Sequence, residues 1–465
     1  KELKQLAIKS GFWDDCINPA LKDELFRRLM LDTGQLASHG RHANLFINGV
    51  FKSYYNLIER PKQDYFQRYF NSTNDWEVLK LGVTEGDATT WNSMVSFAKF
   101  AYNDPTNYTA YCWLADRLDV VNYADYLLVS VYSNNSDWPA NNWIAAREHV
   151  AGAKFFYVPW DSGCSFGYNG AMTVTNNTFV RILSFVAGGA PYALYYNFLR
   201  GSPEFRLICA DRVQKHFFNG GALTDENVSN HYAALKAGMF EPVRYQQRTY
   251  NNDVETNWLP KRRGIIFQHL KDEGYWPETS APLFNRRGGT VTNGFEVILA
   301  HTNSSGVIYF TTDGSDPREA GSGNPIGRLY SAPVRVHQPV TIKARVCNAG
   351  EWSPLDEATF TVADYYQALR LTELMYHPLE NESYEFIELL NSGTSTLAMA
   401  GVRFSEGIEY TFPTDVTLAA GSYLVLAADQ AAFTSRYPDV AVAGVYTGRL
   451  NNAGETVTLV DPQGS

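Results

Sequence analysis

The chain has 465 residues, which at roughly 150 residues per domain is enough for about three domains. Its 45% hydrophobic and 19% charged residues exclude a disordered or low-complexity protein, and its five cysteines, without C-x-x-C spacing, indicate neither a zinc ribbon nor a disulfide framework. The net charge is −10, and about −8 of it lies from residue 365 onward, where 4 Arg and no Lys accompany 12 acidic residues, which excludes nucleic-acid binding by that part.

The first elements that the sequence predicts are a helix and a β-hairpin. Residues 18–31 carry a proline in the first turn and apolar residues at helical spacing, which is typical of a helix. Residues 43–47 and 51–58 are apolar and aromatic runs on either side of Asn48-Gly49, which is the strongest short-range signal for a hairpin.

Two aspartates and an asparagine stand out in the next part of the chain. An apolar segment that starts at Asp125 leads into a polar loop with Asp137 and, five residues later, Asn142, and a strand at 155–158 is followed closely by Asp161. Phosphoryl transfer needs one carboxylate to orient or deprotonate the attacking hydroxyl, and an asparagine with a second carboxylate to hold metal ions. The spacing satisfies this need, but Asp and Asn also gather in loops as turn formers, so both interpretations stay open on the residues alone.

Three tryptophans lie beside these polar residues, at Trp138, Trp143 and Trp160. We expect them to pack and fix the loop, in preference to stacking on a substrate, because large aromatic side chains are highly buried on average.

The segment 179–275 is predicted to be mostly helical. Helices are expected at 204–218, where a serine cap and a proline begin the pattern, and at 224–239 and 259–271. The most apolar stretch, 179–198, is interrupted by Arg, Pro and Asn, so no membrane span is expected.

Beyond about residue 275 the pattern changes to short alternating runs separated by Gly, Pro, Asn and Asp, which is typical of antiparallel β-structure. Strands are expected at 307–311, 340–346, 358–362, 386–390, 410–412, 423–427 and 456–460. The predicted fold class is therefore multidomain, with an α+β domain over 1–275 followed by two antiparallel β-sandwich modules over 276–364 and 365–465. Because the first residue is not Met and a predicted strand runs almost to the last residue, we expect both ends to be cuts in a longer protein.

Five segments of the α+β domain, taken in chain order, form a pattern specific enough to suggest a protein family. They are H-G-R-H-A-N-L-F-I-N-G-V-F-K-S-Y-Y-N-L-I-E-R-P (39–61), D-W-E-V-L-K (75–80), S-D-W-P-A-N-N-W (136–143), F-Y-V-P-W-D (156–161) and F-F-N-G-G-A-L-T (217–224). In this order they resemble the CotH kinase family, the spore coat protein H type of atypical secretory kinase. The resemblance implies an atypical protein-kinase-like fold that uses ATP and a divalent metal, Mg²⁺ or Mn²⁺.

The resemblance also implies roles for four residues. Asp137 matches the catalytic base, and Asn142 and Asp161 match the residues that hold the metal and, through it, the nucleotide. Glu59, which follows the hairpin, matches a position near the adenine side of the nucleotide.

Some features depart from a conventional kinase. The D-F-G triplet is replaced by Asp161-Ser162-Gly163. A kinase also needs a lysine on an early strand and a loop that covers the phosphates, and we expect both to lie upstream of Lys1, in a missing part of the nucleotide lobe. Glu24 is a candidate partner for that lysine, although a solvated glutamate on a helix face is the favoured interpretation.

The two β-modules carry resemblances of their own. The middle one is similar to the chitobiase C-terminal or fibronectin-associated β-module, through I-Y-F-T-T-D-G-S-D-P-R (308–318) and I-K-A-R-V (342–346). The last one is similar to a lamin tail domain, through L-T-E-L-M-Y-H-P (371–378), Y-E-F-I-E-L-L-N (384–391) and L-N-N-A-G-E-T-V-T-L (450–459). Asp313 and Asp316 are interpreted as turn residues and not as a calcium site. Together with a CotH-like kinase domain, these two modules imply a large bacterial protein that is secreted or held in the cell envelope.

The first functional hypothesis is an exported kinase that transfers the terminal phosphoryl group of ATP to a hydroxyl, on a protein rich in Ser and Thr. The alternative is a catalytically dead, kinase-like scaffold in a cell-envelope or extracellular adhesion protein, whose β-modules bind protein or polysaccharide. A third hypothesis has the β-modules bind polysaccharide beside an active kinase. Neither nucleic acid nor a membrane span is expected in any of them.

Overall fold

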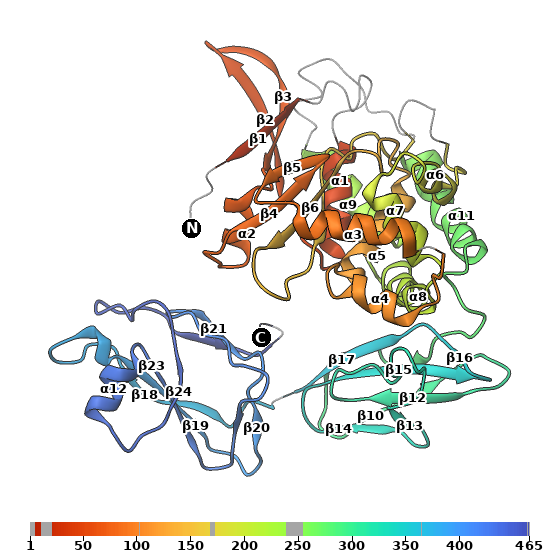
Figure 1. Ribbon diagram of the computed structural model, residues 1–465. Helices are drawn as coiled ribbons and strands as arrows, with labels where there is room; N and C mark the ends of the chain where they lie inside the picture. The colour runs from red at the N-terminus through yellow and green to blue at the C-terminus, as the bar shows by residue number, and fades with distance from the viewer. Residues whose placement is uncertain are drawn as a thin grey trace.

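The computed structural model describes residues 5–10, 21–101, 103–167, 173–238, 254–363, 365–462 and 464. A mixed region of helices and sheets is followed by two regions built mainly from antiparallel strands (Figure 1). The predicted multidomain architecture, α+β and then β, is confirmed. Within the described residues, no helix is long and apolar enough to cross a membrane.

A three-stranded antiparallel sheet lies at the amino-terminal end. Its strands are β1 (Leu6–Ser10), β2 (Gly40–Ile47) and β3 (Val50–Glu59), in the order β1-β3-β2. The β2–β3 hairpin turns at Asn48 and Gly49, whose positive φ angles of 50° and 76° suit the backbone twist of such a turn. The predicted hairpin is confirmed. The predicted helix is α1 (Leu21–Asp32), and residues 18–20 of that prediction lie outside the described part.

A second antiparallel sheet has the order β5-β4-β6-β7. Its strands are β4 (Trp76–Lys80), β5 (Gly82–Glu85), β6 (Trp143–Glu148) and β7 (Phe156–Pro159). Helix α2 (Gln63–Tyr69) precedes β4. The helices between β5 and β6 are α3 (Thr89–Ala101), α4 (Tyr108–Ala115) and α5 (Val120–Ser133).

Helix α5 is the central element of the α+β core, because most of its side chains are buried. Asp119 caps its amino end by accepting hydrogen bonds from two backbone N–H groups, and Asn134 ends it in the left-handed conformation. The aromatic rings around α5 pack edge to face or stack, at Tyr123, Tyr126, Trp138, Tyr157 and Tyr192.

The other helices described in the α+β region follow β7. They are α6 (Thr178–Ser184), α7 (Pro191–Leu199), α8 (Pro203–Phe217), α9 (Asp225–Gly238), a π-helical turn (Val254–Trp258) and α11 (Leu259–Asp272). The three predicted helices are confirmed, with residue 239 of the second outside the described part, and Ser202 caps α8 as its sequence indicated. Arg262 of α11 is fully buried, and its guanidinium donates to the carbonyl oxygens of Val131 and Tyr132 at the carboxyl end of α5.

The two β-modules have separate hydrophobic cores. The middle module contains β8 (Leu283–Phe284), β9 (Gly289–Val291), β10 (Phe295–Val297), β11 (Leu299–Ala300), β12 (Val307–Thr311), β13 (Arg328–Leu329), β14 (Val334–Val336), β15 (Val340–Asn348), β16 (Glu351–Trp352) and β17 (Asp356–Val362). The last module contains β18 (Leu369–Met375), a 3-10 turn (Glu382–Tyr384), β19 (Phe386–Asn391), β20 (Leu397–Ala398), β21 (Arg403–Glu406), β22 (Thr417–Leu418), β23 (Tyr423–Ala427), α12 (Gln430–Arg436), β24 (Val442–Val445) and β25 (Thr458–Val460). The strand predicted at 410–412 is wrong, because only a single bridge, from Thr411 to Arg403, forms there.

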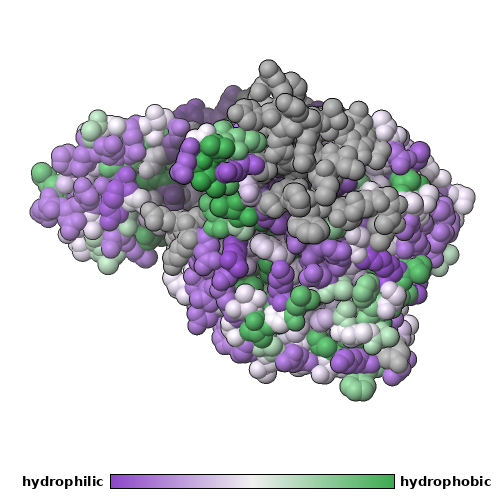
Figure 2. Space-filling model, turned by 90° about the horizontal axis from the view of Figure 1, so that it is seen from above, coloured by the Kyte–Doolittle hydropathy of each residue, from purple (hydrophilic) through white to green (hydrophobic). Residues whose placement is uncertain are grey.

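In the view of Figure 2 the last module, at the left, has a mainly hydrophilic surface.

Ion pairs join the middle module to helix α8, which lies above β17 in Figure 1. Arg345 of β15 is 1% exposed and donates to both carboxylate oxygens of Asp211 on α8, at 2.7 and 2.6 Å. The same guanidinium donates to Asp316, at 2.8 and 2.6 Å. Arg318 forms a second pair with Glu204 of α8, at 2.9 and 2.7 Å. Asp313 and Asp316 both accept backbone hydrogen bonds within the predicted turn, from Ser315 and Arg318, and Asp316 also binds the interface arginine, Arg345.

The opposite side of α8 holds a buried carboxylate on α5. Asp125 accepts hydrogen bonds from Arg212 at 2.6 and 2.8 Å and lies 3.0 Å from His216 Nε2. Gln35, after α1, donates to the same carboxylate at 2.7 Å. Helix α8 is therefore bonded to the middle module on one side and to the helix before the Asp137 loop on the other.

His216 makes the free energy of unfolding depend on pH. Burial lowers the pKa of His216 below its usual 6.5, although the contact with Asp125 opposes this shift. The imidazole therefore binds a proton less readily in the folded protein than in the unfolded chain, so the free energy of unfolding falls as the pH decreases below about 6.5. We expect His216→Gln to flatten this slope in urea titrations at several pH values. The control His337→Gln, on the surface of the middle module, should keep the wild-type slope, and an unchanged slope for His216→Gln would contradict the assignment.

Candidate active site

The loop between α5 and β6 carries the first two predicted site residues. Asp137 is exposed, Asn142 is buried, and the amide of Asn142 donates to Asp137 Oδ2 at 3.3 Å. Between them Trp138 is fully buried against Tyr126 and Tyr192, which holds the loop to the core. The loop thus presents one carboxylate to solvent and keeps the neighbouring amide in place.

Strand pairing brings Asp161 to the same place. Trp143, the first residue of β6, pairs with Pro159, the last residue of β7, so Asn142 and Asp161 both leave the sheet at this edge. The backbone N–H of Ser136 also donates to the carbonyl oxygen of Cys164 at 2.7 Å, which ties the loop to the segment after Asp161. Three residues that the sequence placed on two separate segments therefore lie at one sheet edge.

Two of these residues have an unusual backbone. Asn142 and Asp161 have φ angles of 64° and 58°, in the left-handed region. Non-glycine residues are uncommon there, although Asn and Asp are enriched, and such conformations concentrate at functional sites.

A lysine on the amino-terminal sheet reaches Asp161. Lys9 of β1 places its Nζ 2.6 Å from Asp161 Oδ1 and 3.1 Å from Asp23 Oδ2. Asp23 is a buried residue of α1 that also pairs with Arg27 and accepts a hydrogen bond from the backbone N–H of Ser162 at 2.7 Å. Burial raises the pKa of Asp23, but the charges of Arg27 and Lys9 outweigh this and hold the pKa well below its usual range.

The expectation that the kinase lysine lies upstream of residue 1 stays a prediction, but the chain also carries a lysine on an early strand, Lys9, beside the site. The carboxylate partner of Lys9 on α1 is Asp23 and not Glu24. The interpretation of Glu24 as a solvated glutamate is also wrong, because Glu24 is 4% exposed and bonds to Arg27, Arg28 and Asn56. A short strand of five residues, L-A-I-K-S, gave no signal strong enough to predict β1.

Glu59 lies at the end of β3 with both carboxylate oxygens engaged. One accepts a hydrogen bond from the backbone N–H of His39 at 2.9 Å, and the other pairs with Arg68 of α2. Among the described residues, no hydrogen bond or ion pair joins Glu59 to Asp137, Asn142 or Asp161. Its place beside the nucleotide stays a prediction.

Comparison with known protein families places this site in context. The family described as CotH kinase protein matches residues 1–259, more than half of the chain. The chain belongs to the CotH kinase protein family. Residues 286–359 match the chitobiase/beta-hexosaminidase C-terminal domain, and residues 364–465 match the Lamin Tail Domain. No curated protein matches the chain.

The donor set at the sheet edge of this CotH family member suits a hard divalent cation. Asn142 offers an amide oxygen and Asp161 a carboxylate oxygen, and Mg²⁺ or Mn²⁺ prefers oxygen ligands, with substrate phosphates completing the coordination. The residues present therefore fit the metal that the family implies.

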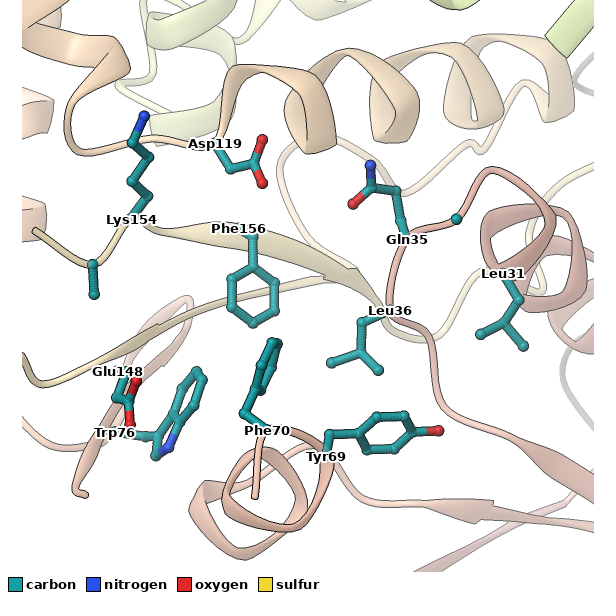
Figure 3. Close-up of a pocket in the computed structure, with 12 residues that line it drawn as sticks. Leu31, Gln35, Leu36, Tyr69, Phe70, Trp76, Asp119, Glu148, Lys154 and Phe156 are labelled. Carbon is teal, nitrogen blue, oxygen red and sulfur yellow. The ribbon is translucent and has the colours of Figure 1, made fainter. Parts of the chain in front are cut away.

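A separate cavity of about 620 Å³ lies away from this site, on the side of α2 (Figure 3). Its wall contains the aromatic side chains of Tyr69, Phe70, Trp76 and Phe156, and Lys154 lies at its margin. None of the four predicted site residues lines it. This cavity is not part of the candidate active site.

Proposed function

We propose that this CotH family protein is a kinase that transfers the terminal phosphoryl group of ATP to a hydroxyl group. The observation that supports this most strongly is the sheet edge where Asp137, Asn142 and Asp161 meet, with Lys9 bound to Asp161. A carboxylate at the acceptor side, an amide and a second carboxylate for metal ions, and a lysine for phosphates are the parts that phosphoryl transfer uses. The acceptor we propose is a protein rich in Ser and Thr, met outside the cytoplasm, in keeping with the secretory kinases that the sequence resembles.

In this proposal each residue has a distinct task. Asp137, exposed to solvent, accepts the proton of the acceptor hydroxyl and orients it toward the phosphoryl group. Asn142 and Asp161 hold the metal, which neutralises charge on the phosphates when bound. Lys9, fixed between Asp23 and Asp161, binds phosphate oxygens from the side of β1. Asp23 positions Lys9, and its hydrogen bond from Ser162 fixes the backbone after Asp161.

The test is the affinity for ATP with and without metal. We expect Asp161→Asn to weaken binding of ATP in Mg²⁺ or Mn²⁺ by at least about tenfold, because one charged ligand is lost while the shape of the side chain is kept. Isothermal titration calorimetry with and without EDTA measures this. The control Asp313→Asn, at an exposed turn in the middle module, should bind ATP like the wild type. Equal metal-dependent affinity in wild type and Asp161→Asn would refute the assignment.

A further inference from the structure

A second lysine lies at the same sheet edge. Lys80 is the last residue of β4, and β4 runs antiparallel to β6, with Leu79 paired with Ala145. The end of β4, the start of β6 and the end of β7 therefore meet at one edge. Lys80 consequently stands at the edge from which Asn142 and Asp161 emerge.

Trp160 holds this lysine beside the site. The Nζ atom of Lys80 lies 5.1 Å from the centroid of the Trp160 ring, and Nζ of Lys9 lies 5.7 Å from the same centroid. Both are distances at which an ammonium is attracted by an aromatic ring. Trp138 and Trp143 are buried as the sequence predicted, but Trp160 is half-buried and serves as a platform for two cations next to Asp161.

The charge around Lys80 is not balanced. Lys9 is shared by Asp23 and Asp161, whereas Lys80 forms no hydrogen bond or ion pair within the described residues. Burial lowers the pKa of Lys80, and Asp161 opposes this while Lys9 and Arg60 lower the pKa further. An anion seated between these cations would relieve their mutual repulsion and replace the lost hydration of Lys80.

We propose that Lys80 is a second phosphate-binding lysine, which contacts the polyphosphate chain of the nucleoside triphosphate from the side of Trp160 while Lys9 contacts it from β1. This inference rests on the proposed kinase function and assigns a catalytic residue to it that lies outside the Asp137 loop and the Asp161 turn. Lys80 is a point charge with three donors on a flexible stem, a form suited to phosphate oxygens whose positions change during transfer. Its ring contact with Trp160 restricts that stem before the nucleotide arrives.

The experiment compares ligands with and without phosphates. Affinities for ATP, adenosine and inorganic tripolyphosphate are measured with Mg²⁺ in the full chain, for wild type, Lys80→Met and Lys80→Arg. Met keeps the length of the side chain against Trp160 and removes only the charge, and thermal melts confirm that each variant is folded. The matched control is Lys154→Met, at the exposed lysine by the cavity of Figure 3, which also forms no ion pair within the described residues.

We expect Lys80→Met to weaken binding of ATP and of tripolyphosphate by about 10- to 100-fold, with adenosine affected less than about threefold. Lys80→Arg should stay within a few-fold of wild type, and Lys154→Met should match wild type. Equal losses for ATP and adenosine, or no loss for ATP, would overturn the role of Lys80 while leaving the kinase proposal in place. If the wild type shows no metal-dependent ATP binding, the kinase proposal fails. If tripolyphosphate then still binds in a way that depends on Lys80, the ligand of Lys80 is a polyphosphate and not a nucleotide, which would overturn the inference as stated.

Discussion

Asp137→Ala should lower the turnover number for phosphoryl transfer by about 10²- to 10⁴-fold, the range that a positioned general base contributes, with ATP affinity kept within about threefold. The rate should fall more than the affinity because Asp137 is exposed and the one described hydrogen bond that its carboxylate accepts comes from Asn142. Phosphate incorporation from labelled ATP into a Ser-rich acceptor gives the rate, and calorimetry gives the affinity.

The matched control for this prediction is Asp116→Ala, at an exposed aspartate that ends α4. It should transfer phosphate at the wild-type rate. An Asp137→Ala protein that transfers phosphate normally would remove Asp137 from the mechanism. Equal losses in rate and in ATP affinity would make Asp137 a residue that maintains the metal site, since Asn142 would then be displaced with it.

Arg345→Met should destabilise the protein by about 3–5 kcal/mol, the usual effect of removing one partner from a buried ion pair. Arg345 is 1% exposed and neutralises two carboxylates, Asp211 and Asp316. Without the guanidinium, burial raises the pKa of Asp211 further, and the two carboxylates face each other across the interface. Urea unfolding followed by circular dichroism, with the transition of the middle module resolved, measures the change.

Arg335→Met is the control for this change in the same module. Arg335 forms an exposed pair with Glu296, with side-chain exposures of 68% and 46%, so its loss should change the free energy of unfolding by at most about 1 kcal/mol. A triple variant that adds Asp211→Asn and Asp316→Asn to Arg345→Met should recover part of the loss, because no buried charge is then left without a partner. Similar small effects for Arg345→Met and Arg335→Met would show that the interface contributes little to stability.

Local patterns predicted the elements whose signals lie within a few residues. The Asn48-Gly49 turn fixes the β2–β3 hairpin, and the Ser202 cap with the following proline fixes the start of α8. The spacing of Asp137 and Asn142 before a hairpin that ends near Asp161 was enough to locate the candidate site, because neighbouring strands bring the two segments together. These features could be predicted because residues close together in the chain determine their structure.

The features that were missed depend on residues far apart in the chain. Lys9 and Asp161 are 152 residues apart, and Arg345 and Asp211 are 134 apart, so no sequence window contains both partners. Lys80 ends a segment that the sequence singled out only for its resemblance to the family, and the order β5-β4-β6-β7 is what shows that this lysine stands beside Asp161. The strand predicted at 410–412 was wrong because a local pattern was not sufficient. The segment alternates as a strand does, but it forms only one bridge, from Thr411 to Arg403.

The left-handed backbone at Asn142 and Asp161 bears on how inactive members of such a family can be recognised. Asn and Asp are the side chains, apart from glycine, that tolerate this conformation best, so a descendant that had lost activity would retain them for reasons of folding alone. Asp137 is under no such conformational demand, since it is absent from the residues with positive φ in the described part of the chain. Loss of the aspartate at position 137, and not the persistence of the other two, is therefore the substitution that distinguishes a pseudoenzyme from a working enzyme built on this loop.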